Sequence, residues 1–289
     1  MADFWPPAPE LRRDDISFHF RNNDYLGHLV APPESVGPRP LVLVVHNFQG
    51  LKYFDDDVAE YLARVGYVGL AVDLYGNIVP PDQRLYPEDP DQVPEFRATC
   101  RKGMDALEND VDLFRSLMQA WLDAGLAHET VDESVSAAAI GYCLGGMAVI
   151  EAVRGGLDLS AAVSFHGLLQ TGAKRADREF EETDIGANTY NTNTVLLIEN
   201  GADDHLVPVE SQQRFFAEMD AAGVDWIFNH HARTPHGFAL PKTLLEPGHL
   251  HEASDRRSTM NMLSVFREVF PGVPQAPVEF NASGTRIPL

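Results

Sequence analysis

Apolar runs alternate along the chain with segments of helical spacing, and this alternation constrains the fold more than any other feature. Strands are predicted at 40–46, 68–75, 136–142, 160–167, 194–201 and 224–231. Continuous apolar runs such as the first two are typical of parallel strands, because neither face of such a sheet meets water. Helices are predicted at 54–65, 95–124, 144–154, 209–222 and 253–269. The pattern therefore predicts an α/β fold with one open, mostly parallel sheet and helices on both faces.

Three further stretches depart from this alternation. The segments ISFHFR (16–21) and YLGHLVAP (25–32), joined by Asn-Asn-Asp, predict an N-terminal antiparallel hairpin. The polar stretches 77–94 and 170–193 follow predicted strands and are expected to be loops, either plain surface loops or loops that cover a site. The Pro-rich stretch 271–289 is expected to be an extended C-terminal tail, packed on its own domain or on the partner subunit of a homodimer.

Charge and targeting signals narrow the functional class. The chain of 289 residues carries 43 acidic and 22 basic side chains, a net charge of −21, so its surface would repel nucleic acid. The N-terminus shows no apolar signal region, and no run of apolar residues reaches the length of a membrane span. With only Cys100 and Cys143 as cysteines, we expect reduced thiols and a cytoplasmic location, with no nucleic acid or membrane as partner.

The stretch AAAIGYCLGGMAVIEAV (137–153) places a cysteine between a predicted strand and a predicted helix. Gly141-Tyr142-Cys143-Leu144-Gly145 has the glycine spacing of a nucleophile elbow, a sharp turn that presents its central side chain at the edge of a sheet. A thiolate there would be stabilised by the helix N-terminus. The alternative is a buried structural thiol, which is the commoner fate of a lone cysteine.

The positions of possible partner residues favour the nucleophile. In α/β-hydrolases an acid and then a histidine follow the nucleophile along the chain, each on a loop after a strand. Here Asp204 follows the strand 194–201 and His236 follows the strand 224–231. Asp203 is an alternative acid, although its spacing from Gly201 fits a turn or capping residue better. A zinc site built from His230, His231 and His236 lacks supporting Cys or carboxylate spacing, so we expect neither a metal nor a cofactor.

With these residues in these positions, the sequence resembles the dienelactone hydrolase family of α/β-hydrolases. The resemblance rests on AIGYCLGGMAV, GADDHLVP, HGFALP and VDLYG, and it extends from about residue 41 to 270. It implies an α/β-hydrolase fold, with residues 1–270 as a single domain. It also implies that Cys143 is the nucleophile, His236 the general base and Asp204 the acid that orients it. The family's oxyanion hole maps onto the backbone N–H groups of Leu144 and Phe48.

Three positions depart from the dienelactone-cleaving members of that family, and each becomes a candidate pocket residue. Asn47 stands where those members carry a glutamate that holds the resting cysteine. His236 would then have to take the thiol proton directly. Asn77 and Leu240 stand where those members carry arginines that bind the substrate carboxylate. Neither side chain can pair with a carboxylate, although Arg84 or Arg97 could replace the missing arginines from another direction.

Together these features predict a hydrolase that acts on a small-molecule ester or lactone through a Cys-His-Asp triad and a thioester acyl-enzyme. The expected substrates are activated esters or lactones and not the anionic dienelactone itself. We expect Cys143 to be the reactive cysteine, because Cys100 lies in a helical pattern without a triad partner. The competing interpretations are a ligand-binding protein without turnover and a redox-responsive protein in which Cys143 is oxidised.

Overall fold

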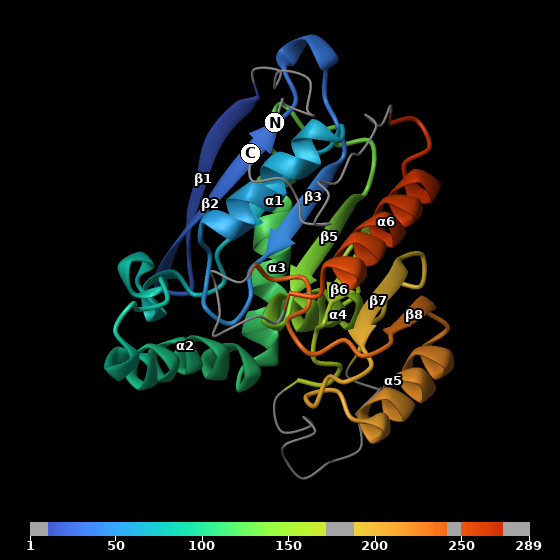
Figure 1. Ribbon diagram of the computed structural model, residues 1–289. Helices are drawn as coiled ribbons and strands as arrows, with labels where there is room; N and C mark the ends of the chain where they lie inside the picture. The colour runs from blue at the N-terminus through green and yellow to red at the C-terminus, as the bar shows by residue number, and fades with distance from the viewer. Residues whose placement is uncertain (1–10, 172–187, 242–249, 274–289) are drawn as a thin grey trace, which may run out of the picture.

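The computed structural model describes residues 11–171, 188–241 and 250–273. These residues form an eight-stranded sheet in the order β1-β2-β4-β3-β5-β6-β7-β8 (Figure 1). Its strands are β1 (Arg12–Phe20), β2 (Asn23–Ala31), β3 (Leu41–Val45), β4 (Val68–Val72), β5 (Ala137–Tyr142), β6 (Leu159–Phe165), β7 (Val195–Gly201) and β8 (Asp225–His231). β1 and β2 pair antiparallel with each other, β2 pairs antiparallel with β4, and the six strands from β4 to β8 in the sheet are parallel.

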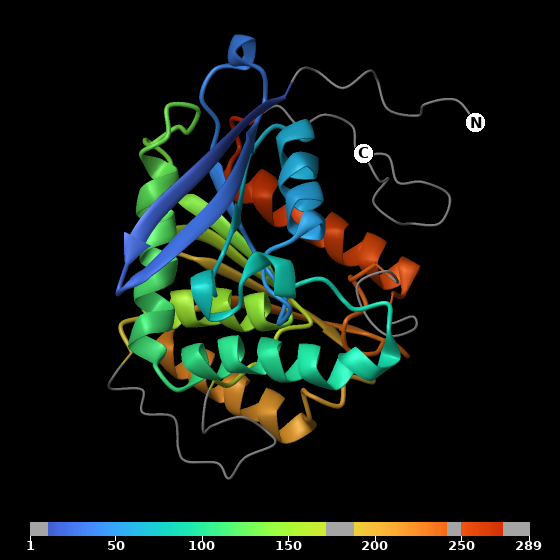
Figure 2. The same ribbon diagram turned by 90° about the vertical axis from the view of Figure 1, so that its left-hand side faces the viewer.

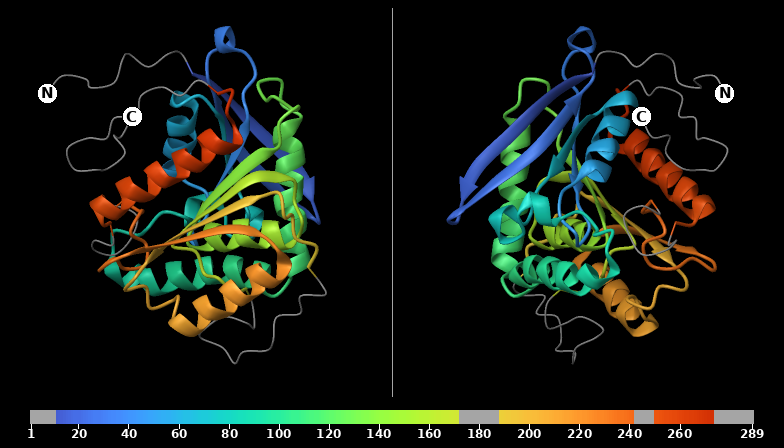
Figure 3. Two further views of the ribbon diagram at one scale, coloured as in Figure 1. Left: turned by 90° about the vertical axis from the view of Figure 1, so that its right-hand side faces the viewer. Right: turned by 60° about the vertical axis from the view of Figure 1, so that its left-hand side comes forward.

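Helices cover both faces of the sheet. They are α1 (Tyr53–Arg64), α2 (Val93–Glu108), α3 (Val111–Leu126), α4 (Leu144–Arg154), α5 (Val209–Ala222) and α6 (Glu252–Val269), with short 3-10 turns at Glu34–Val36, Gly76–Ile78, Pro81–Gln83 and Pro90–Gln92. α1 and α6 pack on one face of the sheet, whereas α3, α4 and α5 pack on the other (Figures 2 and 3). All residues of β3, β4 and β5 are buried because helices lie on both sides of them.

The structure confirms the predicted α/β-hydrolase fold and the antiparallel N-terminal hairpin. The hairpin turn lies at Arg21 and Asn22, whose φ angles of 46° and 62° lie in the left-handed region, as a two-residue turn between right-twisted strands requires. The single helix predicted over 95–124 is wrong, because α2 and α3 are separate helices. Asp110 lies between them, and its side chain accepts a hydrogen bond of 2.8 Å from the N–H of Leu113, which starts a new helix.

Two other expectations can be compared with the structure only within the described residues. Most of the stretch 170–193 and nearly all of the proposed tail at 271–289 lie outside them, so the homodimer through the tail stays a prediction. Within the described residues, no helix combines the length and the apolar character that crossing a membrane requires.

The register of the parallel strands places their carboxyl ends side by side. Tyr142 at the end of β5 pairs with Phe165 at the end of β6, and Gly201 at the end of β7 pairs with His231 at the end of β8. Ligands of open α/β sheets bind outside these carboxyl ends, where the following loops converge. The loops after β3, β5, β7 and β8 therefore converge at the edge of the sheet where a ligand would bind.

Candidate active site

Cys143 occupies the sharp turn between β5 and α4, with φ 56° and ψ −108°. A non-glycine residue adopts such a backbone at a cost of about 1–3 kcal/mol, and the surrounding contacts must hold it there. The flanking glycines make the turn possible. A Cβ on Gly141 would lie 2.0 Å from the carbonyl oxygen of Gly145, and a Cβ on Gly145 would lie 2.1 Å from that of Val45. The turn leaves the Cys143 side chain partly exposed at the edge of the sheet.

The loops after β7 and β8 bring two partners to this cysteine. His236 Nε2 lies 3.2 Å from Cys143 Sγ, and His236 Nδ1 lies 2.8 Å from Asp204 Oδ2. The other oxygen of Asp204 accepts a hydrogen bond of 2.9 Å from the N–H of Leu206, so the carboxylate is buried and held in place. Asp203 is exposed and reaches the site only through its backbone N–H, which donates to Thr234.

The electrostatics of the site favour a protonated His236. Burial opposes the imidazolium and lowers the pKa of His236. The neighbouring Cys143 sulfur and Asp204 carboxylate outweigh burial and raise this pKa to about 10. The ring is further fixed by His166, which packs edge-to-face against it at a centroid distance of 5.1 Å. The geometry thus provides an imidazole that can hold a proton between sulfur and carboxylate.

The possible zinc site also included His230 and His231, and both of these side chains contact other residues. His231 Nε2 lies 2.5 Å from Glu199 Oε2, and His230 packs on the ring of Phe228. Within the described ranges, no group of three His, Cys, Asp or Glu side chains is arranged to hold a metal ion.

A cavity of about 600 Å³ opens in front of Cys143 and His236. Most of its wall is apolar or aromatic and comes from the loops after the strands, from α2 and from the stretch 77–94. The apolar lining residues are Phe48, Tyr86, Phe96, Ala98, Met104, Leu168, Leu206 and Leu240, and the polar ones besides Cys143 and His236 are Asn47, Gln49, Arg97, Arg101 and His205. A wall of this kind suits a small, largely apolar molecule with a few polar groups.

The two predicted oxyanion donors lie on either side of the cysteine. Leu144 is the first residue of α4, where backbone N–H groups have no acceptor within the helix. Phe48 lies on the loop after β3 and lines the cavity. His46 anchors this loop. Its Nδ1 donates to the carbonyl oxygen of Asn47 over 2.6 Å, and its Nε2 accepts from the N–H of Leu74 over 3.0 Å.

This anchor also sets the direction of the Phe48 N–H. Burial holds the pKa of His46 well below its usual 6.5, so the ring is neutral and carries its proton on Nδ1. The described chain contains no cis peptide bond, and in a trans peptide the C=O and N–H groups point in opposite directions. Because His46 holds the carbonyl of Asn47, it turns the N–H of Phe48 the opposite way.

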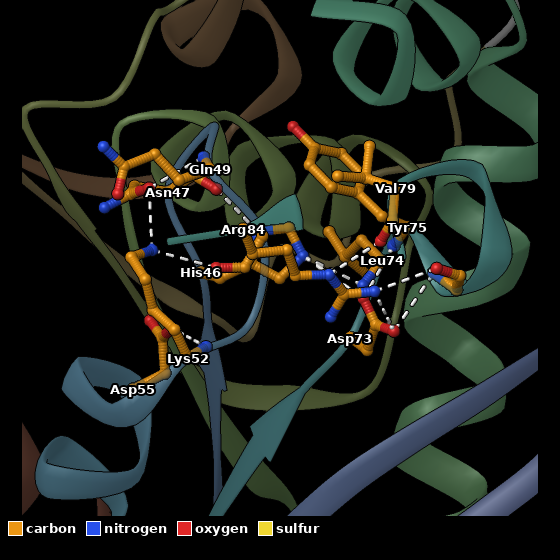
Figure 4. A network of polar contacts seen from close by, with 12 residues as sticks. His46, Asn47, Gln49, Lys52, Asp55, Asp73, Leu74, Tyr75, Val79 and Arg84 are labelled. Carbon is orange, nitrogen blue, oxygen red and sulfur yellow. Dashed lines mark hydrogen bonds and ion pairs between the residues drawn. The ribbon is translucent and has the colours of Figure 1, made fainter. Parts of the chain in front are cut away.

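Of the other candidate pocket residues, the structure brings Asn47 and Leu240 to the cavity but not Asn77. Asn77 is exposed on the turn Gly76–Ile78, where its N–H donates to the Asn23 side chain over 2.8 Å. Arg84 is not a substitute for the missing arginines. It is buried, lies 2.9 Å from Asp73 Oδ2 and donates to the carbonyl of Val79, so it holds the loop after β4 (Figure 4). Arg97 does line the cavity.

Sequence reasoning missed three polar residues at or behind the site: His46, Lys52 and His205. His205 lines the cavity, and Lys52 is a buried lysine beside Asn47. The signals in the sequence are weak. A histidine that ends an apolar strand and a lysine among Gly, Leu and Tyr are both typical of ordinary surface turns, and only the tertiary fold buries them.

A mostly parallel sheet with a Cys-His-Asp constellation on the loops after β5, β7 and β8 defines the protein as an α/β-hydrolase. The chain belongs to the dienelactone hydrolase family, whose model matches residues 26–270. This confirms the resemblance inferred from the motifs.

Individual relatives agree with this assignment. The "Carboxymethylenebutenolidase" of Pseudomonas sp. (strain P51) is 29% identical over 192 residues, which cover 64% of this chain and 68% of that protein. The "Putative hydrolase fragment YghX" of Escherichia coli (strain K12) is 37% identical over 67 residues, so the chain spans 57% of the length of that relative.

Solved structures extend the similarity over nearly the whole fold. "m3DLH" superposes with a TM-score of 0.72 at 28% identity and covers 90% of this chain and 99% of its own. A dienelactone hydrolase-like promiscuous phosphotriesterase, P91 from metagenomic libraries, superposes with a TM-score of 0.73 at 25% identity and covers 90% and 98%.

Proposed function

We propose that this protein hydrolyses an activated carboxylic ester or lactone through Cys143, His236 and Asp204. The observation that carries the proposal is the continuous contact from the Cys143 sulfur through the His236 ring to the Asp204 carboxylate, at 3.2 and 2.8 Å. These distances suit proton transfer between the thiol and the imidazole, and they suit a carboxylate that fixes the imidazole tautomer.

In the first half of the reaction His236 Nε2 holds the thiol proton, as its raised pKa favours, and the Cys143 thiolate attacks the carbonyl carbon of the substrate. The carbonyl π electrons move to oxygen, and the N–H groups of Leu144 and Phe48 donate to the resulting oxyanion. The C=O bond then re-forms, the bond to the leaving oxygen breaks, and His236 returns its proton to that oxygen. The products are an alcohol, an enol or a phenol, and a thioester on Cys143.

In the second half His236 takes a proton from water, and the hydroxide attacks the thioester carbonyl. The C–S bond breaks, the carboxylic acid leaves, and the Cys143 thiolate is left beside the protonated His236, as in the resting site. A thiolate is a better leaving group than an ordinary alkoxide, so the first adduct on an unactivated ester tends to revert. Enol, aryl and strained lactone esters avoid this problem and are the substrates that we propose.

The proposed substrate carries no carboxylate. Leu240 lines the cavity, Asn77 is not among the lining residues, and Arg84 is paired with Asp73. Because the cavity wall is mostly apolar, an acyl or alcohol portion without charge is the better match.

The proposal is tested by the kinetics of the protein with 4-nitrophenyl acetate. We expect a burst of nitrophenolate equal to the enzyme concentration, followed by slower turnover, and an added acetyl mass on the peptide that contains Cys143. Cys143→Ala should lose the burst, while its thermal unfolding stays cooperative. A protein that binds the ester but releases no nitrophenolate would favour the ligand-binding alternative, and an equal burst in Cys143→Ala would remove Cys143 as the nucleophile.

A further inference from the structure

Asn47 has a buried hydrogen-bond donor that no acceptor satisfies within the described residues. Its side chain is 1% exposed and lines the cavity with Cys143 and His236, yet its Nδ2 has no hydrogen-bond partner. An unsatisfied buried N–H group costs about 1–3 kcal/mol, so natural proteins seldom keep one without a ligand or water to fill it. A donor of this kind beside a candidate nucleophile is therefore a sign of a binding interaction.

The surrounding network fixes the orientation of the Asn47 amide. Asn47 Oδ1 accepts from the N–H of Gln49 over 2.9 Å and from Lys52 Nζ over 3.1 Å (Figure 4). Turning the amide over would place its NH₂ group against these two donors. Because two donors converge on Oδ1, Nδ2 is held on the opposite side of the amide.

Lys52 is itself held in place. Its Nζ also donates to the carbonyl of Gly50 over 2.9 Å, and its backbone N–H donates to the carboxylate of Asp55 over 3.0 Å at the start of α1. Lys52 is 7% exposed, and a lysine buried to this extent requires such partners. The backbone of Asn47 is fixed by His46, as described above, so both the main chain and the side chain of Asn47 are oriented before a substrate arrives.

The position of Asn47 selects the substrate atom that it meets. Asn47 directly precedes Phe48, whose N–H is the proposed oxyanion donor on this loop. An ester bound for attack by Cys143 has to place its carbonyl oxygen between this loop and the first turn of α4. That oxygen is an acceptor, and it gains charge as the bond to sulfur forms.

We propose that Asn47 Nδ2 donates a hydrogen bond to the carbonyl oxygen of the substrate, as a third donor beside the N–H groups of Phe48 and Leu144, and that Lys52 is the residue that positions it. The inference rests on the proposed ester hydrolysis and deepens it. The amide of Asn47 can donate to an oxygen atom, but it cannot take a proton from the thiol. Asn47 therefore acts on the substrate oxygen, and the thiol proton is left to His236.

The test compares acylation by four proteins: the native protein, Asn47→Ala, Lys52→Met and the control Lys102→Met, which removes an exposed lysine of α2. Burst rates are measured by stopped flow with 4-nitrophenyl acetate and with its thionoester, whose C=S group is a poor hydrogen-bond acceptor. For Asn47→Ala we expect acylation of the oxygen ester to slow by about 10²-fold. The same variant should lose far less with the thionoester, and KM should change little, because the bond strengthens mainly in the transition state.

Lys52→Met should slow the same step by a smaller factor, because the amide is then free to rotate. The double variant should be no slower than Asn47→Ala, since Lys52 acts only through Asn47. Lys102→Met should match the native protein. If Lys52→Met fails to fold, the two substrates with Asn47→Ala decide the matter alone, because this variant leaves Lys52 bonded to Gly50.

The outcomes separate this inference from the proposed function. A burst rate in Asn47→Ala equal to that of the native protein would overturn the role of Asn47 and leave the proposed hydrolase activity intact. An equal loss with the oxygen ester and the thionoester would show a purely structural role and would also overturn it. Absence of a burst in the native protein with every activated ester would overturn the proposed function, and this inference with it.

Discussion

Two residues of the same type show how the environment of a single side chain decides its chemistry. Cys100 lies fully buried in α2, and burial raises the pKa of its thiol to about 11. Cys143 lies partly exposed at the elbow, 3.2 Å from the imidazole of His236. Since the thiolate is the nucleophilic form of cysteine, burial makes Cys100 inert at neutral pH.

Alkylation should distinguish the two thiols. With a brief, substoichiometric exposure to iodoacetamide at pH 7, we expect the label mainly on Cys143, because Cys100 is fully buried and its raised pKa of about 11 leaves very little thiolate at this pH. Peptide mass mapping measures the ratio, and full labelling of the unfolded protein calibrates both peptides. Earlier labelling of Cys100 would contradict the assignment.

Asp203 and Asp204 form a natural matched pair for testing the acid. The carboxylate of Asp204 contacts His236 Nδ1, whereas Asp203 is exposed and contributes only backbone contacts at the site. For Asp204→Asn we expect kcat with an aryl ester to fall by about 10²–10⁴-fold, because an amide can stabilise the wrong tautomer of the ring. Asp203→Asn should retain most of the native kcat, and similar losses in both variants would assign the orienting role to neither residue.

At the scale of elements, the elbow depends on how closely α4 approaches β3. A methyl group at Gly145 would lie 2.1 Å from the carbonyl oxygen of Val45, and this oxygen belongs to the backbone of a central strand. α4 would then have to move away from the sheet and would carry Cys143 and the N–H of Leu144 with it.

Gly145→Ala is therefore expected to destabilise the fold by about 1–3 kcal/mol and to remove the acylation burst. Gly155→Ala is the matched control at the other end of α4, where the added methyl group would meet the flexible side chain of Arg115 at 3.0 Å. Urea midpoints and burst amplitudes measure both effects. Native stability and a native burst in Gly145→Ala would contradict the close approach.

The sequence correctly predicted the elements whose apolar periodicity is set by their own residues. The predicted helix 144–154 coincides with α4, and the predicted positions of Cys143, Asp204 and His236 after three strands match the structure. The predicted long helix failed because capping by Asp110 outweighed an unbroken apolar spacing. Lys52 escaped notice because its role depends on burial beside Asn47, and burial of a lysine comes from tertiary packing that local sequence does not encode.

At the scale of the whole molecule, the charge of the cavity differs from that of the chain. The net charge is −21, yet the residues that line the cavity include Arg97, Arg101, His205 and His236 and no Asp or Glu. The two arginines lie four residues apart on α2, one helical turn from each other. Arg101 already pairs with Asp105 at 3.0 Å, and its side chain is 42% exposed, so it contacts both the cavity and solvent.

The preference for a neutral or an anionic substrate depends on whether these exposed arginines can bind a carboxylate as well as buried arginines would. Exposed ion pairs contribute about 0–1 kcal/mol and weaken with salt, whereas each charge-assisted bond in a buried site contributes about 1.5–3 kcal/mol. We therefore expect a neutral aryl ester to be hydrolysed with a higher kcat/KM than its carboxylated analogue, with a larger difference at high salt. The double variant Arg97→Gln/Arg101→Gln should lower kcat/KM for the anion by less than about tenfold, and the remote control Arg257→Gln should change neither substrate. A strong preference for the anion that persists at high salt and disappears in the double variant would show instead that α2 carries the carboxylate site, and the cavity would then be specific for acidic esters.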